Sequence, residues 1–207
     1  MSQPKAPTSQ QYSFNPGAMV IVQMGEQLIG HPSTAIGELV KNGYDADATE
    51  CYVYVHTAPD PQDSFLIILD TGLGMSGETL FGDWLRPSIS SKRGADEKDR
   101  KSAVFERNFL GSKGIGRLAA MALGRYVTVI TKQQKERRYN WLKIDRESFK
   151  TDLGVNEVTF PGGELADEPR SLFQVEFPFT KCKLPFKVSQ SKLEVRQLVE
   201  TQWELRS

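Results

Sequence analysis

Apolar residues near the N-terminal end of the chain recur every three or four positions, which predicts two amphipathic helices. The first helix is expected over about 18–29, with an apolar face made of Val20, Ile21, Met24 and Leu28. The second is expected over about 33–45, with a core face made of Ile36, Leu39 and Val40. Residues 1–16 are rich in Gln, Ser and Pro, which predicts a flexible arm before the first helix.

β-branched and aromatic residues then gather in short runs, which predict strands. The runs 51–56 and 65–69 flank the turn signal Asp60-Pro61, so we expect them to pair antiparallel. Later strands are expected over 126–131, 138–144, 157–160 and 172–177. Helices are expected over 114–123 and, at the end of the sequence, over about 191–206. Helices first and hairpin-like strands later predict an α+β sandwich, not repeated βαβ units.

Residues 76 to about 112 interrupt this pattern. The stretch 92–101 is almost wholly charged and has no apolar face, so it cannot bury enough surface to offset its ordering entropy. A solvated loop is the simplest interpretation of such a segment. A mobile lid is the sharper hypothesis, and we favour it because glycine-rich motifs flank the segment on both sides.

The composition is that of an ordinary globular protein, and its charge balance gives no sign of a nucleic-acid-binding domain. The 207 residues include 26 basic and 26 acidic side chains, so the formal net charge is zero. No apolar run approaches the roughly 18 residues that span a bilayer, and the polar N-terminus does not resemble a signal peptide. Cys51 and Cys182 fit no metal-ligand spacing, and reduced thiols suit a cytoplasmic protein.

The second predicted helix carries three polar residues that share one face. Glu38, Asn42 and Asp45 are spaced by four and three residues, so they project from the same side of a helix. A carboxylate there can orient and deprotonate an attacking water, and an amide oxygen is a suitable ligand for Mg²⁺. A solvated helix face explains the same residues, and this segment alone does not decide between the two.

Asp70 directly follows the apolar run 65–69 and precedes a glycine-rich stretch. A carboxylate at a strand end can accept a hydrogen bond from an amino group such as that of adenine. Gly72 and Gly74 allow the backbone to approach a flat ring, and Met75 offers an apolar contact to its edge. A simple β-turn is the bland alternative.

The same stretch also matches two other nucleotide-binding patterns. Residues 72–77 fit the G-x-G-x-x-G dinucleotide fingerprint, but the acidic strand end expected about 20 residues later would fall in the charged segment. An NAD-dependent oxidoreductase therefore stays a rival hypothesis. Residues 72–79 nearly fit a P-loop, which we reject because Glu78 stands where a lysine must face phosphate.

A third motif begins the helix predicted over 114–123. Free backbone N–H groups at a helix N-terminus bind anions, and glycines allow phosphate oxygens to come close. Lys113 adds positive charge beside Gly114, Ile115 and Gly116. A helix start made of small residues is the bland alternative.

In this order and spacing, the three motifs resemble the N, G1 and G2 boxes of the GHKL ATPases, the superfamily of gyrase B subunits, heat-shock-90-type chaperones, histidine kinases and MutL mismatch-repair proteins. The resemblance covers about residues 18–131. It implies the Bergerat fold, a two-layer α+β sandwich. In that fold a mixed, mostly antiparallel sheet carries helices on one face, and ATP lies between the helices and a mobile lid.

The resemblance also implies residue roles. Glu38 would be the general base, Asn42 the Mg²⁺ ligand and Asp45 a polar wall of the pocket. Asp70 would read the adenine amino group. The phosphate-wrapping set would be Lys113, Gly114, Ile115 and Gly116. The stretch 90–92 is similar to a Ser-Lys stretch of MutL lids, and Ser171 is the candidate for a further hydroxyl near adenine.

The resemblance implies an ATP- and Mg²⁺-dependent ATPase domain whose lid closure drives a conformational or dimerisation switch in a larger MutL-, MORC- or chaperone-like protein. We expect the domain over 17–185 and a second domain after the helix within 186–207. Without a transducer domain to contact the γ-phosphate, hydrolysis should be slow. Homodimerisation through ATP-dependent closure is expected, and the protein or DNA partner is unknown. A histidine-kinase module and a non-hydrolysing switch are the alternatives.

Overall fold

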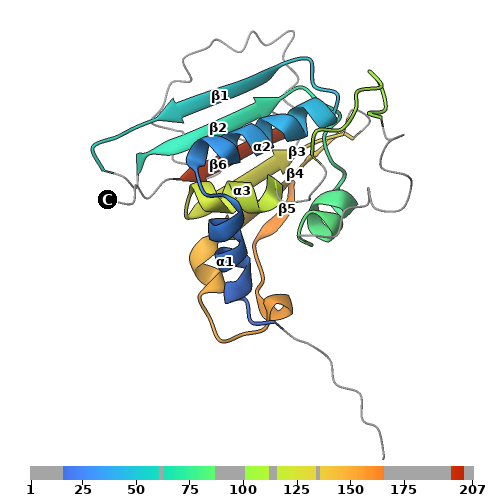
Figure 1. The fold of residues 1–207 in the computed structure, drawn as a ribbon. Helices are drawn as coiled ribbons and strands as arrows, with labels where there is room; N and C mark the ends of the chain where they lie inside the picture. Colours follow the sequence, from blue (N-terminus) through green and yellow to red (C-terminus); the bar gives the residue numbers. More distant parts are fainter. Residues whose placement is uncertain are drawn as a thin grey trace, which may run out of the picture.

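In the part of the chain that the structure describes, a six-stranded antiparallel sheet carries two α-helices on one face, and a third α-helix packs against one of these two (Figure 1). The computed structural model describes residues 16–60, 63–86, 101–111, 116–133, 136–165 and 197–202. The helices are α1 (Met19–Leu28), α2 (Pro32–Asp45) and α3 (Gly116–Leu123). The strands are β1 (Cys51–His56), β2 (Phe65–Asp70), β3 (Tyr126–Thr131), β4 (Tyr139–Asp145), β5 (Gly162–Leu165) and β6 (Gln197–Gln202). This architecture confirms the predicted α+β sandwich.

The elements with clear periodicity form where the sequence predicts them. Both early helices are confirmed, with bounds within about a residue of those expected. The predicted β1–β2 pair is antiparallel, with Cys51 opposite Asp70 and His56 opposite Phe65. The other confirmed elements are α3, β3 and β4.

The strand order is β1-β2-β6-β3-β4-β5, and every described pair of neighbours is antiparallel. The helix predicted over about 191–206 is wrong where it can be compared, because residues 197–202 form β6. Its hexapeptide Gln-Leu-Val-Glu-Thr-Gln can satisfy either period, and β6 gains backbone partners from both β2 and β3. Such long-range pairing is invisible to a local pattern.

The strand predicted over 157–160 is also wrong. A short 3₁₀ turn occupies Val155–Glu157, and the strand comes later, as β5. β5 begins with two glycines, and the low strand propensity of glycine does not predict a strand there. Gly162 is needed because a Cβ there would lie 2.8 Å from the carbonyl oxygen of Trp141 on β4.

The core lies between the helices and the sheet. α3 contacts both α1 and α2, and its small, fully buried residues Ala119 and Ala120 allow that close approach. Alternate residues of the central strands face this layer, which gives the period of two expected of strands. The buried strand residues of this layer include Leu66, Ile68, Val127 and Val129.

The described flanks of the lid predicted over 76–112 are held by contacts with the rest of the structure, and the lid itself stays a prediction. A π-helical turn, Thr79–Asp83, buries Leu80 completely, and Trp84 also joins the core. The 101–111 loop is tied to the end of α2 by hydrogen bonds described below. Residues 87–100, with the MutL-like stretch 90–92, lie outside the described residues, as do the arm over 1–15 and the strand predicted over 172–177.

Candidate functional site

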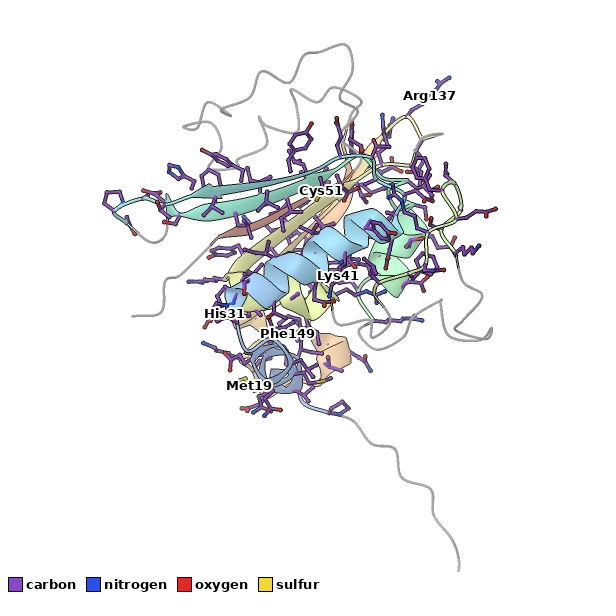
Figure 2. The ribbon with its side chains drawn as sticks, turned by 45° about the horizontal axis from the view of Figure 1, so that its top comes forward. Met19, His31, Lys41, Cys51, Arg137 and Phe149 are labelled. Carbon is purple, nitrogen blue, oxygen red and sulfur yellow. The ribbon has the colours of Figure 1, made fainter. Side chains whose placement is uncertain are left out.

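Helix α2 supplies one wall of the candidate site. His31 caps its N-terminus by accepting a hydrogen bond from the Ser33 backbone N–H at 3.3 Å, and Pro32 occupies the first turn. Figure 2 shows His31 at the start of this helix and Lys41 further along it. The buried residues of α2 are Ala35, Leu39, Gly43 and Asp45, so one polar side chain shares the buried side of the helix.

Asp70 lies at the end of β2, directly beneath α2. Only 4% of its surface is exposed, and a Cβ on Gly43 would lie 3.1 Å from the Asp70 Cβ, so a glycine is what lets helix and strand approach here. Its Oδ1 accepts a hydrogen bond from the Gly72 N–H at 2.9 Å. Within the described part of the chain, no other hydrogen-bond or ion-pair partner meets this carboxylate.

This isolation changes the acidity of Asp70. Burial raises the pKa of the carboxyl to about 6, and the single hydrogen bond from Gly72 offsets only part of that effect. The neighbouring Cys51 thiol responds in turn. Burial first, and then the negative charge of Asp70, raise its pKa to about 11, so this thiol stays protonated at neutral pH.

The loop after Asp70 is held tightly between α2 and β3. A Cβ on Gly72 would lie 2.7 Å from the Ala46 carbonyl oxygen, and the Leu73 N–H donates to that same oxygen at 2.7 Å. Gly74 adopts a φ of 68°, a left-handed conformation that favours glycine. The half-buried Met75 donates its backbone N–H to the Thr131 Oγ1 at 2.8 Å. Residues 72–75, which are predicted to contact the nucleotide, are therefore held in one defined backbone conformation.

Thr131 is a further candidate-site residue, which the sequence reasoning missed. Thr131 and Asp70 both pair with Gln197 of β6, so they lie at the same level of the sheet, two strands apart. Both face the helical layer, and Thr131 is fully buried. The available signal was that Thr131 ends an apolar strand-like run, as Asp70 does. The residue predicted for an adenine-side hydroxyl, Ser171, lies outside the described residues.

Asn42 lies between the start of α3 and the end of the 101–111 loop. A Cβ on Gly116, at the start of α3, would lie 2.6 Å from the Asn42 Nδ2, and a Cβ on Gly111 would lie 3.8 Å from its Oδ1. The Asn42 side chain makes no hydrogen bond to any residue that the structure describes. Its amide oxygen is thus available to a ligand. The other predicted phosphate-binding residues, Lys113, Gly114 and Ile115, are outside the described residues.

Asp45, which the resemblance assigns to a polar wall of the pocket, accepts two hydrogen bonds from the backbone of the 101–111 loop. Its Oδ1 accepts from the Leu110 N–H at 2.8 Å and its Oδ2 from the Gly111 N–H at 2.9 Å. The side chain is buried, and its oxygens hold the end of the 101–111 loop beside Asn42. In this structure Asp45 therefore shapes the site through the loop.

Glu38 lies one helical turn before Asn42. Its Oε1 accepts a hydrogen bond from the Lys41 ammonium at 2.8 Å, and its side chain is 17% exposed. Lys41 was not singled out in the sequence, although a spacing of three residues in a helix is suited to such a pair. The ion pair fixes the direction of the carboxylate and leaves Oε2 as the oxygen that can meet a water molecule.

The donor set can be tested against the cofactors it would hold. An almost buried carboxylate with one hydrogen bond fits an added donor such as an amino group. Among the described residues, no three His, Cys, Asp or Glu side chains are arranged to hold a metal ion. A divalent cation at Asn42 would therefore take most of its ligands from water and phosphate oxygens, as Mg²⁺ commonly does.

Comparison with known proteins identifies the family. Residues 31–166 match the model of a family described as histidine kinase-, DNA gyrase B-, and HSP90-like ATPase. The chain belongs to the GHKL ATPase family. The matched residues include all of α2, the Asp70 loop and α3, which are the elements that gather at the candidate site. The GHKL domain is an ATP-binding one.

A curated relative points to the same family. This GHKL chain is 28% identical over 140 residues to heat shock protein 90-5, chloroplastic, of Arabidopsis thaliana. The alignment covers 59% of this chain and 18% of that protein, so the chain spans less than a fifth of the relative's length. No helix in the described part of this GHKL chain is long and apolar enough to cross a membrane.

Proposed function

We propose that this chain binds ATP with Mg²⁺ and hydrolyses it slowly, as the nucleotide-binding part of a larger protein. In that protein, nucleotide-dependent closure would drive a conformational or dimerisation switch. A cytoplasmic location, a homodimer, and a MutL-, MORC- or chaperone-like role belong to the same proposal. The alignment covers only 18% of the chloroplast relative. Such a short match is what we expect if the chain corresponds to the nucleotide-binding part of a longer protein.

The buried carboxylate of Asp70 is the observation that carries the proposal. A lone ionised group in such a place costs free energy unless a ligand supplies a hydrogen-bond donor. The 6-amino group of adenine is such a donor. Asn42 lies near the start of α3, and the first turn of a helix is a favourable place for a phosphate group.

Hydrolysis would use residues of α2. Asn42 would hold Mg²⁺ through its amide oxygen, and the bound cation would neutralise phosphate charge. Glu38 would accept a proton from water at Oε2 while the water oxygen bonds to the γ-phosphorus and the bond to the β–γ bridging oxygen breaks. A glutamate in this role favours transfer to water over transfer to a protein histidine.

A non-hydrolysing nucleotide switch is the second candidate, and the Glu38–Lys41 ion pair is the observation that favours it. The Lys41 ammonium occupies Oε1 of Glu38, so that oxygen is not available to orient a water molecule. Measuring phosphate release under conditions where MgATP binding is saturated separates the two candidates. Turnover near one per second by the isolated chain would contradict the proposal of slow hydrolysis.

Calorimetric titration with MgATP and, separately, with NAD⁺ tests the binding proposal. We expect MgATP to bind the wild-type chain, the Asp70→Asn variant to lose that binding, and NAD⁺ to give no heat. The exposed Asp152, for which the structure gives no partner, provides the matched control, Asp152→Asn. Equal affinity of wild type and Asp70→Asn for MgATP would refute the assignment of Asp70 to adenine.

A further inference from the structure

Asp47 has a backbone conformation that the end of a helix normally gives to glycine. Its φ is 61°, one of two positive values among the described non-glycine residues. The Asp47 N–H donates to the Tyr44 carbonyl at 3.1 Å and the Ala48 N–H to the Gly43 carbonyl at 3.0 Å. This is the Schellman arrangement, in which the left-handed position is usually Gly because a Cβ is unfavourable there. The aspartate must therefore contribute something that glycine lacks.

What it contributes is a buried carboxylate that accepts three hydrogen bonds from the 101–111 loop. The donors are the Ser102 hydroxyl, the Val104 N–H at 2.8 Å and the Phe105 N–H at 3.1 Å. Burial acts to raise the pKa of Asp47, but these hydrogen bonds and the nearby Arg107 charge outweigh it, and the net pKa is lowered. The carboxylate is thus ionised at neutral pH.

Arg107 strengthens the same attachment from the loop side. Its Nη1 donates to the Ala48 carbonyl at 2.7 Å and to the Tyr44 carbonyl at 3.3 Å, both at the C-terminal end of α2. The guanidinium lies 4.7 Å from the ring centre of Tyr44 and 4.6 Å from that of Phe105. A cation is favourable there, because the last carbonyls of a helix carry partial negative charge.

The far end of the loop reaches the candidate nucleotide site. Leu110 and Gly111 donate their N–H groups to Asp45, two residues before Asp47. Gly111 lies close enough that a Cβ on it would be 3.0 Å from the Asp45 Oδ2 and 3.8 Å from the Asn42 Oδ1. Two aspartates at the end of one helix therefore hold the two ends of the same loop.

We infer that Asp47 is a positioning residue for the phosphate side of the bound nucleotide, acting through the 101–111 loop on Gly111, Asp45 and Asn42. The inference rests on the proposed function. The proposed adenine contacts come from other elements, because Asp70 lies on β2 and the loop after it is hydrogen-bonded to Thr131 on β3. Loss of Asp47 should therefore weaken recognition of the phosphates and leave recognition of the adenine ring unchanged.

Two substitutions separate this role from a purely structural one. Asp47→Gly supplies the residue that the left-handed helix end prefers, so the fold is kept while the carboxylate is removed. Asp47→Asn keeps the size but turns an NH₂ group toward the backbone donors of the loop. The Asp152→Asn variant, in an exposed loop, controls for the loss of one negative charge.

The decisive measurement compares MgATP with adenosine, which lacks phosphates. We expect both Asp47 variants to bind MgATP about tenfold or more weakly, since small displacements of positioning groups have effects of that order, and to bind adenosine as the wild type does. Equal weakening toward both ligands, or unchanged MgATP affinity, would overturn the inference. If the wild type itself fails to bind MgATP, the proposed function fails first.

Hydrogen exchange without nucleotide tests the path along the loop. In Asp47→Gly, the amides of Val104 and Phe105 should exchange faster because they lose their acceptor. The amides of Leu110 and Gly111 should also exchange faster if the loop moves as a unit. Faster exchange confined to Val104 and Phe105 would show that Asp47 does not act on the site, and would overturn the inference.

Discussion

Replacing Asp70 with asparagine should make the chain more stable in the absence of nucleotide. Burial raises the Asp70 pKa from the ordinary 3.8 to about 6. At neutral pH the ionised carboxyl therefore lowers the free energy of unfolding by about 3 kcal/mol. An asparagine is neutral and can still accept the hydrogen bond from the Gly72 N–H. At pH 7.5 we therefore expect Asp70→Asn to be more stable than the wild type by about that amount.

The sign of the pH dependence follows from the raised pKa. The folded wild type binds the Asp70 proton more tightly than the unfolded chain does, so this group stabilises the fold progressively as the pH falls through about 6. The variant lacks this gain. Its advantage should shrink by about 2 kcal/mol between pH 7.5 and pH 4.5. Asp47 has a lowered pKa and destabilises both proteins in acid, so its effect cancels in the difference.

Urea denaturation followed by circular dichroism, at several pH values in this range, measures that difference directly. The same samples should show that MgATP raises the midpoint of the wild type but not of Asp70→Asn, because only a ligand that binds the folded state stabilises it. Parallel stability curves for the two proteins, or a variant that is less stable at pH 7.5, would refute the reasoning about this carboxylate.

Three further substitutions test separate parts of the site and core. Glu38→Ala should keep MgATP affinity and lose hydrolysis about a hundredfold or more, and a loss of binding in calorimetry would show that Glu38 has another role. Gly72→Ala should cost about 1–3 kcal/mol in urea denaturation and weaken MgATP binding, because its Cβ would lie 2.7 Å from the Ala46 carbonyl oxygen; unchanged stability would contradict the tight turn. Leu80→Ala should cost about 2–5 kcal/mol, since Leu80 is fully buried, and a loss under about 1 kcal/mol would mean that the π-helical turn is not part of the core.

The sequence predicted those parts of the molecule whose cause is local. The period of 3.6 in α2 and the apolar run of β2 predicted these two elements, and so placed Asn42 on the helix and Asp70 at the end of the strand. Strand β6 was missed because its partners are distant in sequence. Asp47 was missed for the same reason, since its acceptor role depends on Ser102, 55 residues later.

The place of β6 has a consequence for how the chain folds. The last described strand fills the slot between β2 and β3, so these two strands gain their shared neighbour only after the rest of the described chain has been synthesised. Until then, each of them presents an unpaired strand edge with apolar side chains, which is a template for aggregation. Such non-local pairing also slows folding. Shortened versions ending before residue 197 should therefore aggregate during expression, even though every candidate nucleotide residue would be present.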